Sequence, residues 1–300
     1  MWKPVFLDYS YNFAVRNFRH GSFGNITKID NTRQVKNSES FFSVAAGMPL
    51  AHRGVFLIRA NGGHVNYRYD SDELFADDTD HSRYSFFGIK AELARNTLDK
   101  FLYPRRGSDL KLSGIFVTGR DKYEPFDAEK FLSRTSRQWV GARLTWDKYF
   151  DMPGCSWFSL GLNVDGVITN HPEFTTEGAT VMSMPAYEPV PHAQMIYMPD
   201  FRGKRFAAGG VMPTFDLMPN FFLRTGFYAM FREKRSFVPG VSGPVEDKRW
   251  HYIAEASLVY HTPIGPVSLA LTKYDLRNWK NMYLTFNFGY AIFAPKGTFY

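Results

Sequence analysis

The sequence predicts an all-β protein, a transmembrane antiparallel β-barrel of about 13 to 16 strands. Three observations lead to this prediction: apolar and polar residues alternate along most of the chain, helical periodicity is almost absent, and short connections alternate with long ones. The 300 residues include 29 Phe and 17 Tyr, interleaved with polar residues rather than gathered in blocks. Such interleaving favours strands whose two faces meet different surroundings.

The alternation is clearest in residues 137–150, "RQWVGARLTWDKYF". The apolar face of this segment carries Val140, Ala142, Leu144 and Trp146. The opposite face carries glycine and isolated charged or polar residues, and residues 155–170 and 281–293 show the same division. A soluble sandwich usually presents Lys, Glu and Thr to water, whereas a membrane barrel presents a long apolar face to lipid. The pattern therefore favours the membrane barrel over a soluble β-sandwich or lipocalin-like barrel.

Thirteen strands are expected, in order, each bounded by turn residues such as Gly, Pro and Asn. They are 5–17, 21–30, 40–50, 54–68, 82–98, 107–120, 137–150, 155–170, 205–217, 220–233, 248–261, 265–274 and 281–293. Residues 127–136, "DAEKFLSRTS", are expected to form a short helix in a loop. Short connections are expected at 19–21, 51–54, 100–107, 151–154, 218–220 and 262–266, and the connections between them are long. This regular alternation is typical of outer-membrane barrels.

Composition limits the possible functions. The formal net charge of +7 is dispersed along the chain, so no nucleic-acid partner is expected. The single cysteine, Cys155, excludes an intramolecular disulfide and a cysteine metal cluster. No apolar run reaches the ~18 residues of a membrane helix, and the first residues do not have the pattern of a signal peptide. We expect no cofactor and no metal site.

Three motifs resemble the surface-antigen barrels, the BamA-like superfamily that includes the outer-membrane barrel assembly protein and two-partner secretion transporters. They are "NTLDKFLYPRRGSDL" (96–110), "FRGKRFAAGG" (201–210) and "YHTPIGPVSLAL" (260–271). Residues 184–231 and the ending "FNFGYAIFAPKG" are similar, more narrowly, to the C-terminal barrel of patatin-like outer-membrane proteins of the Bacteroides group. The resemblance implies one barrel domain over residues 1–300 in the bacterial outer membrane.

The resemblance also implies a role. In that family a patatin lipase domain precedes the barrel, and the barrel would anchor or translocate it; the partners would be outer-membrane lipid and that domain or a translocated polypeptide. A patatin hydrolase needs a nucleophilic Ser in a Gly-x-Ser-x-Gly turn. No such motif occurs here, so we expect no catalytic residue and no enzyme activity from this chain. The alternatives are a stand-alone insertion or secretion barrel and a soluble β-sheet binding module.

The resemblance suggests candidate residues in a long loop, 171–203, that folds into the barrel. Arg202 and Gly203 correspond to the superfamily's loop tip, where the arginine pairs with an acidic residue on the wall. The wall position here is His261, so Glu255, on the same face of that strand, is the expected substitute partner. His251 also shares this face, but a strand rises about 3.3 Å per residue, so residues 251 to 261 span too far to bind one metal ion. We interpret His251, Glu255 and His261 as polar side chains that line the lumen.

The connection around Tyr103, Pro104, Arg106 and Gly107 is expected to cap a hairpin on the periplasmic side. Docking of a periplasmic domain or of anionic headgroups is the functional alternative. Interface belts are expected from six aromatic residues, namely Trp139, Trp146, Trp157, Phe158, Tyr252 and Tyr290. Because single-chain bacterial barrels have even strand numbers, thirteen strands would indicate a fragment of a longer chain, or a barrel completed by a partner.

Overall fold

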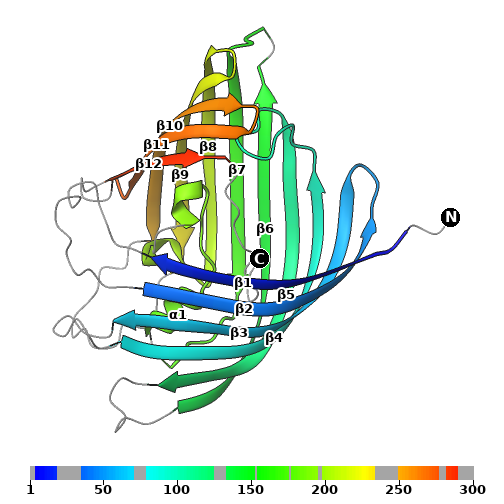
Figure 1. Ribbon diagram of the computed structural model, residues 1–300, viewed down its shortest axis with the longest axis vertical. Helices are drawn as coiled ribbons and strands as arrows, with labels where there is room; N and C mark the ends of the chain where they lie inside the picture. The colour runs from blue at the N-terminus through cyan, green and yellow to red at the C-terminus, as the bar shows by residue number, and fades with distance from the viewer. Residues whose placement is uncertain are drawn as a thin grey trace.

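The computed structural model describes residues 4–18, 35–70, 79–124, 133–152, 154–175, 177–194, 198–233, 249–276 and 282–289. These residues form one sheet of twelve antiparallel strands, each hydrogen-bonded to its neighbours in chain order. The strands are β1 (Phe6–Phe18), β2 (Val35–Pro49), β3 (Gly54–Asp70), β4 (Thr79–Asn96), β5 (Gly107–Glu124), β6 (Ser133–Asp151), β7 (Phe158–Thr169), β8 (Arg205–Met218), β9 (Phe221–Arg232), β10 (Trp250–Thr262), β11 (Gly265–Tyr274) and β12 (Met282–Phe288). Figure 1 shows the sheet curling around the segment that carries the helix α1 (Glu177–Ser183).

The connections alternate between the two ends of the sheet, and their lengths follow the predicted alternation with one exception. Those after β2, β4, β6, β8 and β10 lie at one end of the sheet, which we call the turn side, and the others lie at the opposite end, the loop side. The exception is the connection between β4 and β5, residues 97–106, which is longer than the loop-side connections 71–78, 125–132 and 275–281. The remaining turn-side connections are short. β1 begins and β12 ends on the turn side, because the number of described strands is even.

Three details differ from the expectation. Twelve strands are described rather than thirteen, and β1 pairs directly with β2 from Phe6↔Gly47 to Phe18↔Val35. The expected strand 21–30 lies outside the described residues. Residues 133–136 belong to β6 rather than to the expected helix, whose remaining residues lie outside the described part. The described sheet has an even number of strands, and the count of thirteen stays a prediction.

The convex face of the sheet is apolar. Leu112 faces Leu93 on one neighbouring strand and Leu144 on the other, and all three side chains are exposed. Aromatic groups lie toward both ends: Trp157, Phe158 and Phe215 pack together on the turn side, and Phe231, Trp250 and Tyr252 pack together on the loop side. This arrangement resembles the aromatic girdles of membrane barrels.

Of the six residues expected in these belts, Trp157, Phe158 and Tyr252 belong to the two aromatic groups just described, and Trp146 lies on the same strand face as Leu144. Trp139 is a correction. It is buried on the concave face, because its odd position on β6 places it opposite Val140 and Leu144. Tyr290 lies outside the described residues.

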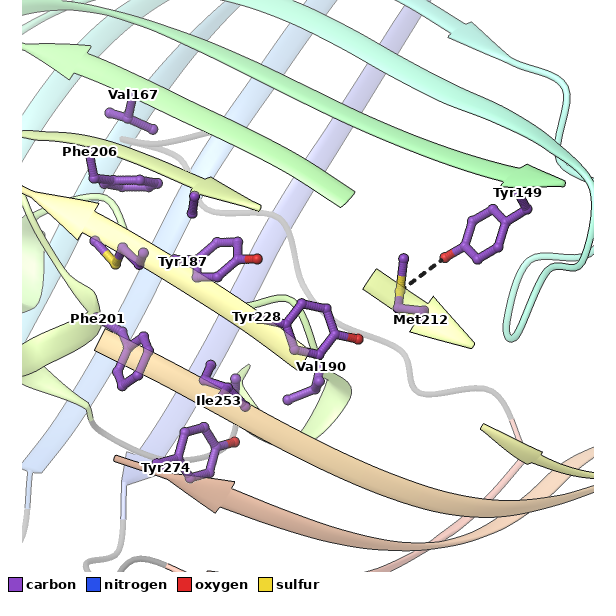
Figure 2. Packing of buried hydrophobic residues seen from close by; sticks show 13 residues of the cluster. Tyr149, Val167, Tyr187, Val190, Phe201, Phe206, Met212, Tyr228, Ile253 and Tyr274 are labelled. Atoms are coloured by element: carbon purple, nitrogen blue, oxygen red, sulfur yellow. Dashed lines mark hydrogen bonds between the residues drawn. The ribbon is translucent and has the colours of Figure 1, made fainter. Parts of the chain in front are cut away.

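The hydrophobic core lies on the concave face. One cluster joins side chains of β2 to β6 to Phe174, Ala179 and Met182 of the segment between β7 and β8. A second joins β6 to β11 to Tyr187 and Phe201 of the same segment, and Figure 2 shows these side chains between strands and segment. The core is therefore formed between one curved sheet and its own connection. No helix in the described residues is long and apolar enough to cross a membrane.

Candidate functional site in the lumen of the sheet

The segment between β7 and β8, residues 170–204, fills the concave face, and we call it the lumen loop. Its two ends are fixed at one point. The Thr169 N–H donates to the carbonyl of Lys204 at 3.0 Å, and the Lys204 ammonium lies 3.5 Å from the Glu173 carboxylate. Asn170 exchanges hydrogen bonds with the backbone of Val140 on β6. The loop therefore begins and ends beside the same strands.

The first part of the lumen loop docks through aromatic packing. The Phe174 ring meets Tyr84 edge-on at 5.1 Å between centroids and Trp139 at 6.2 Å. At the next residue, the N–H and the hydroxyl of Thr175 both donate to one carboxylate oxygen of Asp121 on β5, at 3.0 and 2.9 Å. Burying one such aromatic side chain contributes about 1.5–3 kcal/mol. Residues that follow in α1 continue the same cluster.

His171 lies where the lumen loop leaves β7. It is buried, with its ring 4.7 Å from that of Trp139 and 5.4 Å from that of Phe174. Burial away from water lowers the pKa of His171 to about 3, and the nearby cations Lys204 and Arg137 act in the same direction. The imidazole is therefore neutral at physiological pH.

The middle of the lumen loop is held by polar groups of the wall. Arg143 on β6 makes a two-pronged ion pair with Asp165 on β7, and its guanidinium also donates to the carbonyl of Ala186 at 3.2 Å. Beside it, the Tyr187 hydroxyl donates to the side-chain oxygen of Asn163 at 2.7 Å. Charge-assisted, two-pronged pairs are among the stronger polar contacts in proteins. The wall therefore binds both the backbone and a side chain of the loop.

Arg202 lies in the lumen, 5% exposed, and it makes hydrogen bonds to the backbone of the loop itself. Its guanidinium donates to the carbonyls of Met182 and Met184 at 2.9 and 3.2 Å, at the C-terminal end of α1. These are carbonyls that a helix leaves without an intrahelical partner. Its carboxylate neighbour is Glu188 at 3.9 Å. The adjacent N–H of Gly203 donates to the carbonyl of Pro185 at 3.1 Å.

The expected pairing of Arg202 with Glu255 is not the geometry that the structure shows. The Glu255 carboxylate accepts from the hydroxyls of Ser257 and Thr272, at 2.9 and 3.5 Å. The cation that interacts electrostatically with the Glu255 carboxylate is Arg224, on the neighbouring strand β9. The physical reason is proximity: Glu188 belongs to the same loop as Arg202, and Arg224 and Glu255 face the lumen from adjacent strands.

His261 lies on the same face of β10 as Glu255, as expected, but nearer to the turn side. Its ring is 5.3 Å from that of Phe222. It also lines a turn-side hollow of about 330 Å³ together with Lys100, Arg105 and Asp216. His261 is thus placed with the turn side of the lumen and not with the Arg202 contacts. No group of three or more His, Cys, Asp or Glu in the described part of the chain could hold a metal ion.

The connection between β4 and β5, residues 97–106, also enters the lumen, and we call it the turn strap. Tyr103 is 8% exposed, and its hydroxyl donates to the Ser268 hydroxyl on β11 at 2.9 Å. Pro104 beside it is buried as well. Burial raises the pKa of Tyr103, so its phenol stays neutral. The turn strap therefore caps the β4–β5 hairpin and also contacts the distant strand β11.

The remaining predicted residues of this connection fix its two ends. Arg106 is 73% exposed in its side chain and pairs with Asp151 at 2.6 Å on the outside of the turn. Gly107 has a φ of +99°, and a Cβ there would lie 2.2 Å from the carbonyl oxygen of Thr97. Glycine is therefore required where the strap rejoins β5.

A half-buried arginine, Arg224 on β9, lies beside the turn strap. Its guanidinium is 5.5 Å from the ring centroid of Tyr103 and 5.8 Å from that of Tyr149. It also donates to the sulfur of Met212 at 2.7 Å. Figure 2 shows Met212 accepting a second hydrogen bond from the Tyr149 hydroxyl. Stacking on aromatic faces is a common way to hold a guanidinium away from water.

Sequence reasoning missed four of these residues as members of a site: Arg143, Asp165, Tyr187 and Arg224. A signal existed for the first two, because the alternation places them on the polar face of adjacent strands. Tyr187 carried no such signal, because it lies in a long connection without strand periodicity. Arg224 lies in a predicted strand, where periodicity gives its face but not its contacts with Tyr103 and Tyr149. No motif indicates such partners.

The comparisons with known proteins concern the fold. No protein-family model and no curated protein matches the chain. Among solved structures, it is similar to BamA from Haemophilus ducreyi lacking POTRA domains 1–3, with a TM-score of 0.58 and 12% identity. That match covers 94% of this chain and 57% of that one, so the chain spans little more than half of its length.

The β-domain of the Bordetella autotransporter BrkA aligns over 93% of this chain and 94% of that one, at 9% identity. Its TM-score of 0.35 is too low to support an argument. The similarity to BamA supports the fold class predicted from the sequence, an antiparallel β-barrel of the BamA-like type.

Proposed function

We propose that this chain is the membrane-embedded barrel of a bacterial outer-membrane protein, and that it anchors a patatin-like lipase domain. The observation that carries the membrane role is the contrast between the two faces of the sheet. The convex face is apolar with aromatic groups at both ends, while the concave face is filled by the lumen loop. A sheet that presents such a face must bury it, and lipid is the partner that barrels of this fold use.

The patatin domain is supported by the motif resemblance of residues 184–231 and of the β4–β5 connection. Anchoring fits the filled lumen better than continuous translocation, because a translocated chain would have to displace the lumen loop and its buried contacts. A role in translocation would require the lumen loop to leave the concave face of the sheet. The lipase activity would belong to the preceding domain.

A second candidate is a stand-alone insertion or secretion barrel that acts on other polypeptides. The observation that favours it is that β1 and β12 are the edges of the described sheet, each with one hydrogen-bonded neighbour. An unpaired edge can add a further strand. A soluble binding module is a third candidate, and the exposed apolar residues of the convex face disfavour it.

Two experiments separate these candidates. Cells that produce the protein are fractionated, and the folded protein is tested for heat-modifiable migration in detergent. Recovery in the outer-membrane fraction with a shifted band is expected, and a soluble protein without detergent would contradict both membrane candidates. The coding sequence upstream is then read: a Ser nucleophile turn supports the lipase anchor, and peptide-docking repeats support the insertion barrel instead.

A further inference from the structure

The turn strap is attached to strands far from its own hairpin. It connects β4 to β5, yet Tyr103 bonds to Ser268 on β11, and the Arg105 guanidinium pairs with Asp216 on β8. The Tyr103 ring also meets Phe222 of β9 edge-on at 6.1 Å. The strap therefore crosses the concave face and lies over the turn-side end of the lumen.

A small apolar cluster lies under the strap. Tyr103 and Leu102 pack there against Phe222 and against Val259, which is fully buried. Among the residues that the structure describes, this cluster includes none of the lumen loop. Leu98 of the strap packs against the cluster that contains Tyr187 and Phe201 of the lumen loop, whereas Tyr103 and Leu102 pack in the turn-side cluster. Tyr103 is therefore held by residues of the wall strands rather than by the lumen loop.

The docked strap holds a strained residue. Tyr103 has a φ of +52°, in the left-handed region that a residue with a Cβ adopts at a cost of roughly 1 kcal/mol or more. The Asp99 carboxylate shapes the turn by accepting from the N–H groups of Arg105 and Arg106. Strained residues persist where surrounding contacts over-determine them, and they are frequent in segments that switch between two positions.

We infer that the turn strap is a turn-side gate of the lumen, with Tyr103 as its latch. In the docked position the Tyr103 ring covers Val259 and stacks on Arg224. In the released position the strap leaves β8, β9 and β11, its backbone strain is relieved, and the turn-side end of the lumen opens. A polypeptide or solute that moves along the concave face must displace this gate as well as the lumen loop. The inference rests on the fold and not on the proposed lipase domain.

Thiol labelling of a buried position tests the gate. Cys155 is replaced by Ser, Val259→Cys is introduced, and a water-soluble maleimide reports on the cluster under the strap. Tyr103→Ala should raise the labelling rate of the folded protein at least about tenfold, because the ring that covers the position is gone. Phe101→Ala is the matched control, since Phe101 is an aromatic residue of the same strap that is 77% exposed. Its labelling should equal that of the parent.

The parent protein tests the motion itself. If the strap opens while the barrel stays folded, Val259→Cys in the parent labels faster than the protein unfolds, with the heat-modifiable band retained. Labelling only at the rate of global unfolding would show that the strap does not open in the folded protein, and it would overturn the proposal of a gate. Should Tyr103→Ala fail to fold, Asp216→Asn, which weakens the hold on Arg105, replaces it. An unchanged labelling rate in a folded variant of either kind would also overturn the inference.

Discussion

Arg143 and Asp165 form a two-pronged ion pair across β6 and β7, with nitrogen-to-oxygen distances of 3.0 and 2.6 Å. The same guanidinium donates to the carbonyl of Ala186 in the lumen loop. One ion pair therefore joins two wall strands and the loop that fills the lumen. Because both side chains are largely shielded from water, either charge alone would be costly.

Replacing Arg143 with Ala should lower the free energy of unfolding by about 3–5 kcal/mol, since it leaves a buried carboxylate without its partner. The measurement is urea-induced unfolding in detergent or lipid, followed by tryptophan fluorescence. The control is Arg106→Ala, which removes a solvent-exposed ion pair and should cost no more than about 1 kcal/mol. Equal effects of the two substitutions would contradict the buried role of Arg143.

Replacing Phe174 with Ala should release the first part of the lumen loop. The ring packs against Tyr84 and Trp139, and loss of a buried aromatic side chain costs about 3–5 kcal/mol. Limited trypsin digestion is the measurement, because undocking makes cleavage after Arg202 and Lys204 faster. Phe101→Ala should leave the digestion unchanged. A loop that stays resistant in the Phe174 variant would show that this contact does not hold it.

Docking of the lumen loop should weaken in acid through His171. The folded pKa of about 3 lies below the ordinary value of about 6.5. Between these values the undocked state binds more protons, so docking is fully stable above about pH 6.5 and loses about 1.4 kcal/mol per pH unit below it. Trypsin digestion or tryptophan fluorescence against pH measures this. His171→Phe should remove the step, and an unchanged pH profile in that variant would contradict the assignment.

Much of the fold could be predicted from the sequence, because alternation is a local property. The side chains of Leu93, Leu112 and Leu144 are on the faces that periodicity assigns to them. The helix α1 was not predicted, since its seven residues are too short to establish a period of 3.6. The direct pairing of β1 with β2 was missed for a different reason: periodicity identifies strands but does not decide which strands pair.

The site could be predicted only in part, for a physical reason. Periodicity states which face a side chain occupies, and it placed Glu255 and His261 on one face of β10. It does not state which residues of a long connection reach that face. The partners of Arg202 and the entry of Tyr103 into the lumen are set by the paths of two connections, and those paths depend on contacts between distant residues.

The most direct test of the account is the cost of a charge on the convex face, measured by equilibrium unfolding in phospholipid bilayers. Leu112 lies in the apolar band, and Thr118 lies on the same face of β5, two residues before the exposed Arg120. Leu112→Arg should lower the free energy of unfolding by about 2–4 kcal/mol, and Thr118→Arg by no more than about 1 kcal/mol. Equal, small effects at both positions would contradict a convex face that lies in lipid.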